Sequence, residues 1–292
     1  MIKGLVLKAV GGKYDVKTKK GLFNCEIRGV VKKSNKRPIV GDFVKIEIIN
    51  KDKNEGMIKK ILSRKSKLDR PLVANVNQAV IVFSIKNPNP NFQLLDRLLV
   101  LSHYNNLLPI ICFNKTDLID LKEIKKYKNI YKKIGYDVFL TSTKDEKGIE
   151  KLKEKLNDNI SVFAGPSGVG KSSILNCLDK SLNLRTGEIS KKINKGKHTT
   201  RHTELLKLNQ GGWVVDTPGF ENLKLPKIDH YHLQDYFLEI KKNKYGCKFN
   251  DCLHINEPKC RILDLVKKKE ISKQRYNSYV YILNELQNYR RY

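Results

Sequence analysis

A glycine-rich segment in the middle of the chain has the residue types and spacing that bind phosphate. Residues 165–172 read Gly-Pro-Ser-Gly-Val-Gly-Lys-Ser and match the pattern G-x-x-x-x-G-K-[ST], between an apolar run and a helix-like stretch. The backbone N–H groups of such a loop close around phosphate oxygens at the start of a helix. Lys171 would reach the β- and γ-phosphates, and Ser172 would bind Mg²⁺. The segment therefore predicts a nucleotide site.

A second motif predicts which base the nucleotide carries. This N-K-x-D motif consists of Asn114, Lys115, Thr116 and Asp117. Its spacing can place the Asp117 carboxylate opposite the N1–H and the exocyclic amine of guanine, two donors that adenine lacks. An unpaired carboxylate in a pocket is costly, so adenine is rejected. Asn114 and Lys115 would brace the base and the phosphate loop, and a loop of small residues containing Thr141 and Ser142 would touch the guanine.

Two later loops have the composition of a nucleotide-dependent switch. Asp216 begins Asp-Thr-Pro-Gly after an apolar run, where it would hold Mg²⁺ through water, and the N–H of Gly219 would sense the γ-phosphate. Residues 196–201 read Gly-Lys-His-Thr-Thr-Arg and offer the hydroxyl of Thr199 or Thr200 to Mg²⁺ and the γ-phosphate. The pattern does not choose between the two threonines.

Phe220 follows the second of these loops. In Ras-like enzymes this place holds the glutamine that orients the attacking water, which phenylalanine cannot do. We therefore expect slow intrinsic hydrolysis unless another group supplies that function. His198 is the best local candidate for a catalytic role and His202 the second, while the alternative is a histidine that contacts RNA or only solvent.

Cysteine and histidine cluster near the C-terminal end with the spacing C-x4-C-x-H-x5-C. The four residues are Cys247, Cys252, His254 and Cys260. Three thiolates and one imidazole complete the tetrahedral ligand set of a structural Zn²⁺ and leave no position for a catalytic water. The alternative is three reduced surface cysteines. We expect zinc to be needed here, because the surrounding segment looks too small and polar to fold on an apolar core of its own.

The elements that must position these residues alternate between strands and helices. Apolar runs at 78–85, 107–114, 136–142 and 159–165 alternate with helix-like stretches at 91–105, 121–135, 148–157 and 172–182. This rhythm predicts a mostly parallel sheet that is covered on both faces, in an α/β fold. Residues 203–209 and 213–217 flank Gln-Gly-Gly and predict a hairpin with one antiparallel edge strand.

The flanking segments predict two smaller units. Residues 1–66 hold five short strands and 18 basic against 6 acidic side chains, which indicates a small β-barrel of the OB or the SH3 type that could bind RNA. Residues 226–292 hold the Cys/His cluster, followed by a helix-like tail over 267–292. We therefore predict three units, at 1–66, 67–225 and 226–292.

Composition narrows the class of partner. The 292 residues carry a formal net charge of +28, which favours a polyanion such as nucleic acid, although lysine-rich codon bias would account for part of the surplus. The apolar runs are too short to span a membrane, and the first residues look like a strand rather than a signal peptide. We expect a cytoplasmic protein without a membrane partner, and a monomer by default.

The order of the motifs differs from that of a Ras-like GTPase. There the phosphate loop comes first, followed by the switch threonine, D-x-x-G, N-K-x-D and the last guanine loop. In this chain N-K-x-D stands at 114–117 and the small-residue loop at 141–143, ahead of the phosphate loop and of D-T-P-G at 216–219. The same motifs are present in a rotated order along the chain, which indicates a circular permutation of the domain.

Taken together, these motifs resemble the family of ribosome small-subunit-dependent GTPases known as RsgA, YjeQ or EngC, over essentially the whole chain. The resemblance implies an OB-fold barrel, a permuted GTPase domain and a mostly helical zinc domain. It also implies hydrolysis of GTP to GDP and phosphate, stimulated by the 30S subunit and its rRNA, in late maturation of that particle. The first switch is the weakest match, because Arg201 stands where the family often has a third threonine.

The resemblance also implies roles for single residues. The guanine contacts are Asn114, Lys115, Thr116, Asp117, Thr141 and Ser142. The phosphate and Mg²⁺ contacts are Gly165, Pro166, Ser167, Gly168, Val169, Gly170, Lys171, Ser172, Ser173, Asp216 and Gly219. The zinc ligands are the four residues of the Cys/His cluster.

Two other functions stay open at this point. The first is an RNA-binding factor whose GTP site acts as a conformational sensor with negligible turnover, which Phe220 favours. The second is an enzyme that transfers phosphate to a small metabolite, against which the N-K-x-D and D-x-x-G motifs argue.

Overall fold

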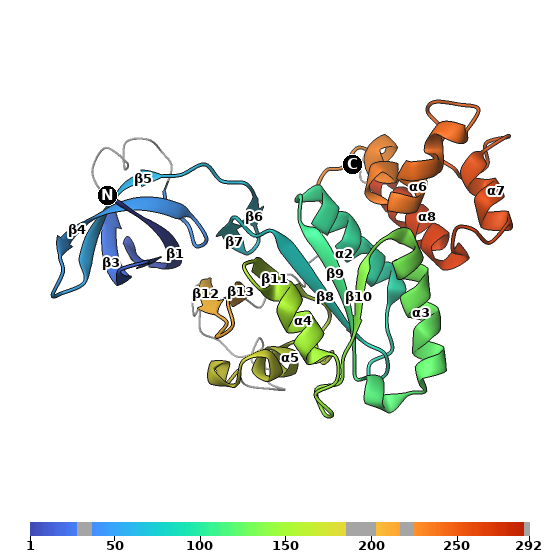
Figure 1. Ribbon diagram of the computed structural model, residues 1–292. Helices are drawn as coiled ribbons and strands as arrows, with labels where there is room; N and C mark the ends of the chain where they lie inside the picture. Colours follow the sequence, from blue (N-terminus) through green and yellow to red (C-terminus); the bar gives the residue numbers. More distant parts are fainter. Residues whose placement is uncertain (28–36, 185–202, 217–224, 289–292) are drawn as a thin grey trace, which may run out of the picture.

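A computed structural model describes residues 1–27, 37–184, 203–216 and 225–288. Along the chain lie a barrel of strands, a central sheet flanked by helices, and a helical C-terminal region (Figure 1). The barrel and the C-terminal region lie on opposite sides of the central sheet (Figure 1).

The N-terminal strands close into a barrel of the OB type. The strands are β1 (Ile2–Val10), β2 (Lys13–Thr18), β3 (Gly21–Ile27), β4 (Phe43–Asn50) and β5 (Glu55–Ile61). Their order is β1-β2-β3-β5-β4, and β1 also pairs with β4, which closes the barrel. Alternate residues point inward and exclude water, among them Val6, Val16, Phe23, Val44 and Ile46. The closed order favours OB over SH3, a choice that composition left open.

The central sheet is parallel, as predicted. Its strands β10 (Asp137–Leu140), β9 (Leu108–Asn114), β8 (Gln78–Ser84), β11 (Ile160–Ala164) and β13 (Trp213–Asp216) lie side by side in that order. Every residue of β8 is buried, because helices cover both faces of the sheet.

Within the described residues, four helices cover the central sheet, two on each face (Figure 1). Helices α2 (Phe92–Tyr104) and α3 (Leu121–Ile134) pack on one face, and α4 (Ile149–Leu156) and α5 (Lys171–Leu178) pack on the other. Successive side chains of β8 alternate between these two apolar layers: Ile81 belongs to the first and Val82 to the second.

The predicted hairpin forms, but its outer strand is not an edge. Strand β12 (Glu204–Lys207) runs antiparallel to β13 and also pairs with β1 of the barrel, with Lys8 opposite Glu204. The barrel and the central sheet therefore form one eleven-stranded sheet among the described residues. The hairpin pattern could not reveal this, because the pairing joins segments almost 200 residues apart.

A short two-stranded sheet follows the barrel. Its strands are β6 (Lys67–Asp69) and β7 (Leu72–Ala74). The N–H of Ala74 donates to the carbonyl oxygen of Val40, and Asn75 Nδ2 donates to that of Gly41, both at 2.8 Å. Gly41 has φ +84°, and a Cβ there would lie 2.0 Å from the Ala74 oxygen, so only glycine fits. This contact ties the barrel to the start of the central domain.

The C-terminal region is helical. Its elements are η4 (His230–Tyr236), α6 (Leu238–Asn243), η5 (Lys244–Gly246), α7 (Arg261–Lys267) and α8 (Lys273–Asn288). The helix-like tail expected over 267–292 is confirmed as α8, but it begins only at Lys273 because the chain turns between α7 and α8. Lys269 adopts φ +62°, and the N–H groups of Glu270 and Ile271 both donate to the carbonyl oxygen of Leu265, which ends the helix there.

An apolar core holds the C-terminal region, contrary to our expectation of a segment too polar to have one. Phe237, Ile262 and Tyr279 lie at its centre, and Val100 and Leu101 of α2 belong to the same cluster. The core was missed because it is built from η4, α6, α7 and α8 together with a helix of the central domain, and no single segment shows it. The region therefore docks on α2 through buried apolar side chains.

Candidate functional site

The predicted nucleotide loops all follow strands whose carboxyl ends lie at one edge of the central sheet. In register, Asn114 of β9 stands beside Ser84 of β8, and Leu140 of β10 stands beside Phe113. Strand β11 ends at Ala164, beside Ile81. Because the strands are parallel, the loops that follow them meet at the same edge, where open α/β sheets bind their ligands.

The phosphate loop connects β11 to α5. Gly165 has φ +136°, and a Cβ there would lie 2.0 Å from the carbonyl oxygen of Val82, so the loop runs directly over β8. Helix α5 begins at Lys171, whose Nζ donates to the carbonyl oxygens of Gly165 and Pro166 at 2.6 and 2.9 Å. The ammonium group therefore lies at the mouth of the loop, and Ser172 and Ser173 follow in the first turn of the helix.

Asn114 joins the base loop to the phosphate loop. Its side chain is fully buried at the end of β9. Its Nδ2 donates to the carbonyl oxygen of Val169 at 2.9 Å, and its Oδ1 accepts from Thr141 Oγ1 at 3.1 Å. A Cβ on Gly170 would lie 2.3 Å from Asn114 Nδ2, so this bond also requires a glycine at that position. One asparagine thus holds three of the predicted loops in place.

Lys115 makes a second connection to the phosphate loop. It adopts φ +61°, and its Nζ donates to the carbonyl oxygen of Gly168 at 2.7 Å and also to that of Asn87. Thr116 begins η1 (Thr116–Leu118), and its N–H and Oγ1 both donate to the carbonyl oxygen of Thr141. The sequence did not indicate this role for Asn87, because the contact uses its backbone carbonyl and does not depend on the type of side chain.

Asp117 is presented outward by Ser142. The Ser142 hydroxyl, which is buried, donates to Asp117 Oδ1 at 2.8 Å, and Asp117 is exposed. Gly148 supports this loop, because its φ is +74° and a Cβ there would lie 2.0 Å from the carbonyl oxygen of Leu140. In the sequence, the only feature that could have indicated this role of Gly148 is its place just before an amphipathic helix. The carboxylate is therefore oriented to accept hydrogen bonds from a ligand.

The predicted switch residues are described only in part. Asp216 ends β13 and stands opposite Glu204. Loss of hydration and repulsion from Glu204 raise the pKa of Asp216, so a cation there would be favourable. The other switch positions lie outside the described residues; they are His198, Thr199, Thr200, His202, Gly219 and Phe220.

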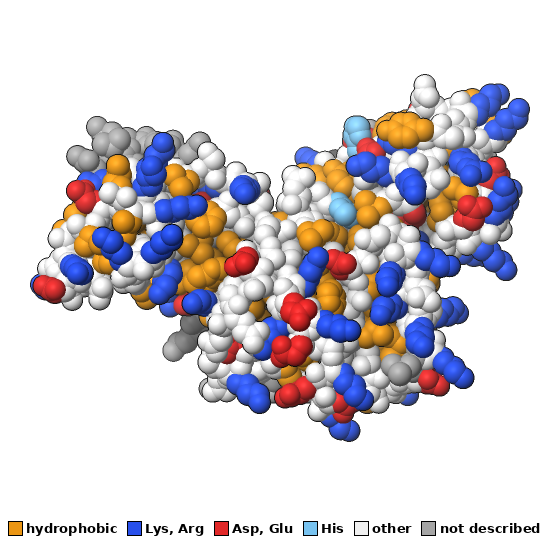
Figure 2. Space-filling model, viewed as in Figure 1, with side chains coloured by type: hydrophobic (Ala, Val, Ile, Leu, Met, Phe, Trp, Pro, Cys, Tyr) orange, Lys and Arg blue, Asp and Glu red, His pale blue; other side chains and the backbone are white. Residues whose placement is uncertain are grey.

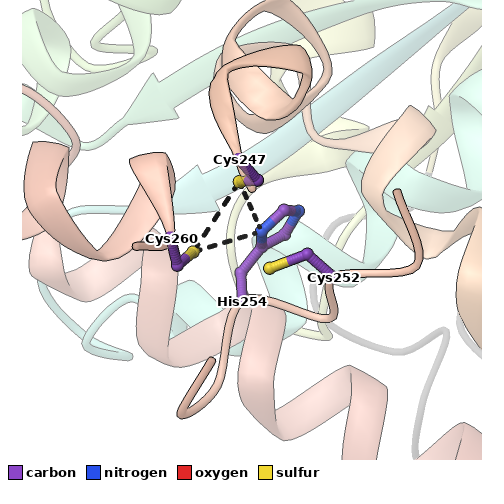
Figure 3. Close-up of side chains that lie close together, drawn as sticks. All are labelled: Cys247, Cys252, His254 and Cys260. Atoms are coloured by element: carbon purple, nitrogen blue, oxygen red, sulfur yellow. Dashed lines mark hydrogen bonds between the residues drawn. The ribbon is translucent and has the colours of Figure 1, made fainter. Parts of the chain in front are cut away.

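The predicted metal ligands converge in the C-terminal region (Figure 3). Their ligand atoms all lie within 4.8 Å of one another. The Sγ atoms of Cys247 and Cys260 are 3.8 Å apart, and His254 Nδ1 lies 3.5 and 3.4 Å from them. A tetrahedral Zn²⁺ at its usual bond lengths puts two sulfur atoms about 3.8 Å apart and a sulfur and a nitrogen about 3.5 Å apart. The cluster fits zinc in both geometry and donor chemistry.

The surroundings of His254 favour a neutral ligand with Nδ1 directed at the cluster. Its Nε2 lies 3.0 Å from Gln234 Oε1, a contact that sequence reasoning missed. Because that oxygen only accepts, the proton belongs on Nε2 and Nδ1 is left to bind a metal. Burial lowers the pKa of His254 to about 4, so the ring is neutral near pH 7. Burial raises the pKa of the Cys252 and Cys260 thiols, and a bound Zn²⁺ would deprotonate them.

The loop that carries the cluster is fastened from two sides. The Glu257 carboxylate accepts from the N–H groups of Leu253 and Ile255 at 2.8 and 2.7 Å. From α8, Tyr276 donates its hydroxyl to the carbonyl oxygen of His254, and Tyr279 donates to that of Leu253. This metal loop, residues 247–260, is therefore bonded to α8, the helix that docks on the central domain.

Among the described residues, none of the helices combines the length and the apolar character that crossing a membrane would require.

Fold and motif order together define a circularly permuted P-loop GTPase. The guanine loops after β9 and β10 precede the phosphate loop after β11 in the chain, yet all lie at one edge of the sheet. A profile described as "RsgA GTPase" matches residues 58–226, and one described as "RsgA N-terminal domain" matches residues 3–58. The chain belongs to the RsgA GTPase family.

Individual relatives match over nearly their whole length. A small ribosomal subunit biogenesis GTPase RsgA from Alkaliphilus metalliredigens is 43% identical over 292 residues, all of both chains. Another from Clostridium novyi is 45% identical over 98% of this chain and 97% of its own. The crystal structure of YloQ, a circularly permuted GTPase, is 37% identical, covers 99% of this chain and 96% of that chain, and has a TM-score of 0.85. That of YjeQ from Thermotoga maritima is 36% identical over 98% of both chains, also with a TM-score of 0.85.

Proposed function

We propose that this GTPase binds the small ribosomal subunit and hydrolyses GTP there to time its own release late in maturation of the particle. The proposal is supported by two hydrogen bonds: Asn114 joins the predicted base loop to the predicted phosphate loop through Val169, and Ser142 joins the two predicted guanine loops through Asp117. The names of the full-length relatives supply the partner. The protein would act as a monomer in the cytoplasm, where the particle is assembled.

Guanine recognition would be the task of Asp117. Its carboxylate, oriented by the Ser142 hydroxyl, would accept the N1–H and the exocyclic amine of guanine. Asn114 and Lys115 would hold this loop against the phosphate loop, and Thr141 would fix Asn114 from the other side. Because these side chains are already bonded to one another, they need little reordering when the base binds.

The phosphates would be held by residues 165–173. The N–H groups of the loop and the Lys171 ammonium would bind the β- and γ-phosphates. Ser172 and Asp216 would hold Mg²⁺, which when bound neutralises charge on these phosphates. One Zn²⁺ would be held by the cluster of Figure 3, as a structural ion with no open ligand position.

Charge supports an RNA-containing partner. The net charge of +28 is spread over much of the molecule, and Figure 2 shows lysine and arginine on the barrel, along α3 and on the C-terminal region. A ribosomal subunit is a polyanion, so a surface of this kind favours its binding and makes it dependent on salt. We assign the three units to 1–66, 67–225 and 226–292, with the outer two as RNA-binding candidates.

The test is GTP hydrolysis by the zinc-loaded protein, alone and with purified 30S subunits. Purified 50S subunits and bulk RNA serve as controls. We expect a large increase with 30S subunits only. Lys171→Ala should abolish the increase, while Lys180→Ala, an exposed lysine just beyond α5, should retain it. Binding of GTP without any increase would favour the conformational sensor, which Phe220 in place of the water-orienting glutamine also favours.

A further inference from the structure

Two aromatic side chains near the metal cluster face solvent. Tyr245 is 85% exposed, the most exposed large apolar side chain among the described residues, and Phe249 is 40% exposed. Both lie in the segment 244–252, two residues to either side of the metal-ligand candidate Cys247. Neither belongs to the apolar core of the C-terminal region, so the fold gives no reason for an aromatic residue at these positions.

Each of these rings has a lysine beside it. The Lys244 ammonium lies 5.4 Å from the centroid of the Tyr245 ring, and the Lys248 ammonium lies 5.3 Å from that of Phe249. Lys244 is also paired with Asp235, 2.6 Å away. No carboxylate of the described residues forms an ion pair with Lys248, which leaves its charge available to a ligand.

The backbone around the two rings is held in place. The N–H of Cys247 donates to the carbonyl oxygen of Lys244, and the N–H of Lys248 donates to that of Lys259, at 3.1 and 3.4 Å. Cys247 itself belongs to the Cys/His cluster, so a bound Zn²⁺ would fix the chain at the midpoint between the rings. The rings are therefore presented from an ordered support, which lowers the entropy cost of binding.

The chemistry of this surface matches an unpaired nucleotide. An exposed ring offers a face on which a base stacks, and a neighbouring ammonium offers a charge for its phosphate. A protein partner would call for a contiguous apolar patch. Here the sequence neighbours of the two rings are mostly polar instead, among them Asn243, Lys244, Lys248, Asn250 and Asp251.

We propose that Tyr245 and Phe249 form a stacking platform for unpaired RNA bases, with Lys248 at an adjoining phosphate. The proposal rests on the proposed RNA-containing partner and adds the kind of RNA that this end of the molecule contacts. It assigns recognition of single-stranded or looped RNA to the metal loop, whereas lysines elsewhere bind the backbone of paired and unpaired RNA alike.

The experiment measures binding of the full-length, zinc-loaded protein to a mixed-sequence single-stranded RNA of about twelve nucleotides, within the usual site size for such binding. A duplex of the same length is the reference. Removing one stacked ring costs about 1–3 kcal/mol, so Tyr245→Ala/Phe249→Ala should weaken single-strand binding at least about tenfold and leave duplex binding unchanged. Tyr245→Phe/Phe249→Tyr keeps both rings and should restore the affinity. Tyr281→Ala, which removes a tyrosine that is 51% exposed on α8, is the matched control.

Two further measurements distinguish stacking of bases on the rings from attraction between the lysine charge and the phosphates. The double alanine variant should keep the wild-type dependence of affinity on salt, while Lys248→Ala should lower the logarithmic salt slope by about 0.7. In Tyr245→Trp the new indole should be quenched by the single strand, measured against the one natural tryptophan, Trp213 of β13.

Three results would overturn the proposal: unchanged single-strand affinity in the double alanine variant, equal loss for single strand and duplex, or an indole that the RNA leaves unquenched. An equal loss would assign the segment to the phosphate backbone alone. Lys171→Ala should bind the oligonucleotide like wild type, so a failure of the GTPase proposal is distinguishable from a failure of this one. Unchanged zinc content and thermal unfolding show that each variant is folded.

Discussion

The amide of Asn114 donates to the carbonyl oxygen of Val169 at 2.9 Å, across 55 residues of sequence. The first lies in the loop that would read the base and the second in the loop that would hold the phosphates. A side chain that is fully buried and bonded on both sides does not move independently of either loop. The two loops are therefore coupled in this fold, although the permutation has separated their segments in the chain.

This coupling predicts that Gly170→Ala weakens GTP binding. The new Cβ would lie 2.3 Å from Asn114 Nδ2, so the amide must leave Val169. We expect a loss of roughly ten- to a hundredfold in GTP affinity, equivalent to about 1.4–3 kcal/mol. Gly135→Ala is the matched control, because Gly135 has φ +114° and nothing within 4 Å of its Cβ position. Both variants carry the strain of a left-handed alanine, about 1–2 kcal/mol, so equal GTP affinities in the two would refute the coupling.

Ser142→Ala tests how the base is read. Removing the hydroxyl leaves Asp117 Oδ1 without the donor that orients it. A hydrogen bond to a charged group contributes about 1.5–3 kcal/mol, so GTP affinity should fall roughly tenfold or more. ITP lacks the exocyclic amine that Asp117 would accept, so the preference for GTP over ITP should narrow as well. Equal losses for both nucleotides would mean that Ser142 supports the loop without orienting the carboxylate.

Cys260→Ser should remove the metal without detaching the C-terminal region. Zinc content should fall from one ion per chain towards zero, and hydrogen exchange should speed up over residues 247–260. The core around Phe237 and Tyr279 also contains buried side chains of α2, α7 and α8, so amides of α8 should stay protected. Cys177→Ser, a half-buried cysteine outside the cluster, should keep the metal. Loss of protection in α8 together with the metal loop would show instead that zinc holds the whole region.

The features that depend on the local spacing of residues were predictable from the sequence. The apolar runs gave the parallel strands, and the spacing C-x4-C-x-H-x5-C brought four ligand atoms together, because short loops leave few other arrangements. The base and phosphate loops follow apolar strands, as the sequence context of their motifs predicted.

What escaped prediction depends on contacts between distant segments. The pairing of β12 with β1, the bond from Lys115 to the Asn87 carbonyl, and the Gln234 partner of His254 all join residues that no local pattern relates. The apolar core of the C-terminal region was missed for the same reason. The turn between α7 and α8 was missed because Lys269, a residue with no special turn preference, adopts the left-handed conformation there.

A buried ion cluster joins the C-terminal region to the central domain. Arg275 of α8 is 1% exposed, and its guanidinium donates to Asp96 of α2 at 2.6 Å and to both carboxylate oxygens of Glu239 at 2.8 and 3.1 Å. The Tyr131 hydroxyl of α3 donates to the same oxygen of Asp96. Burial raises the pKa of Asp96, which the charge of Arg275 opposes. One guanidinium therefore bridges two carboxylate groups in the core, one from α2 and one from α6.

Arg275→Met should destabilise the contact between the C-terminal region and the central domain. The loss of stability should be smaller at acidic pH. Removing one partner of a buried ion pair costs about 3–5 kcal/mol, so the thermal midpoint should fall by roughly 5–15 °C at pH 8. Without the guanidinium, the folded-state pKa of Asp96 rises further above its unfolded value. The folded state then binds a proton more tightly than the unfolded state, so the loss of stability relative to wild type should shrink as the pH is lowered from 8 to 5.

Arg97→Met, which breaks the less buried pair with Glu285 between the same two helices, is the control and should show a smaller, nearly pH-independent loss of stability. A deficit that grows in acid, or one no larger than that of Arg97→Met, would exclude Arg275 as the charge that holds the two domains together.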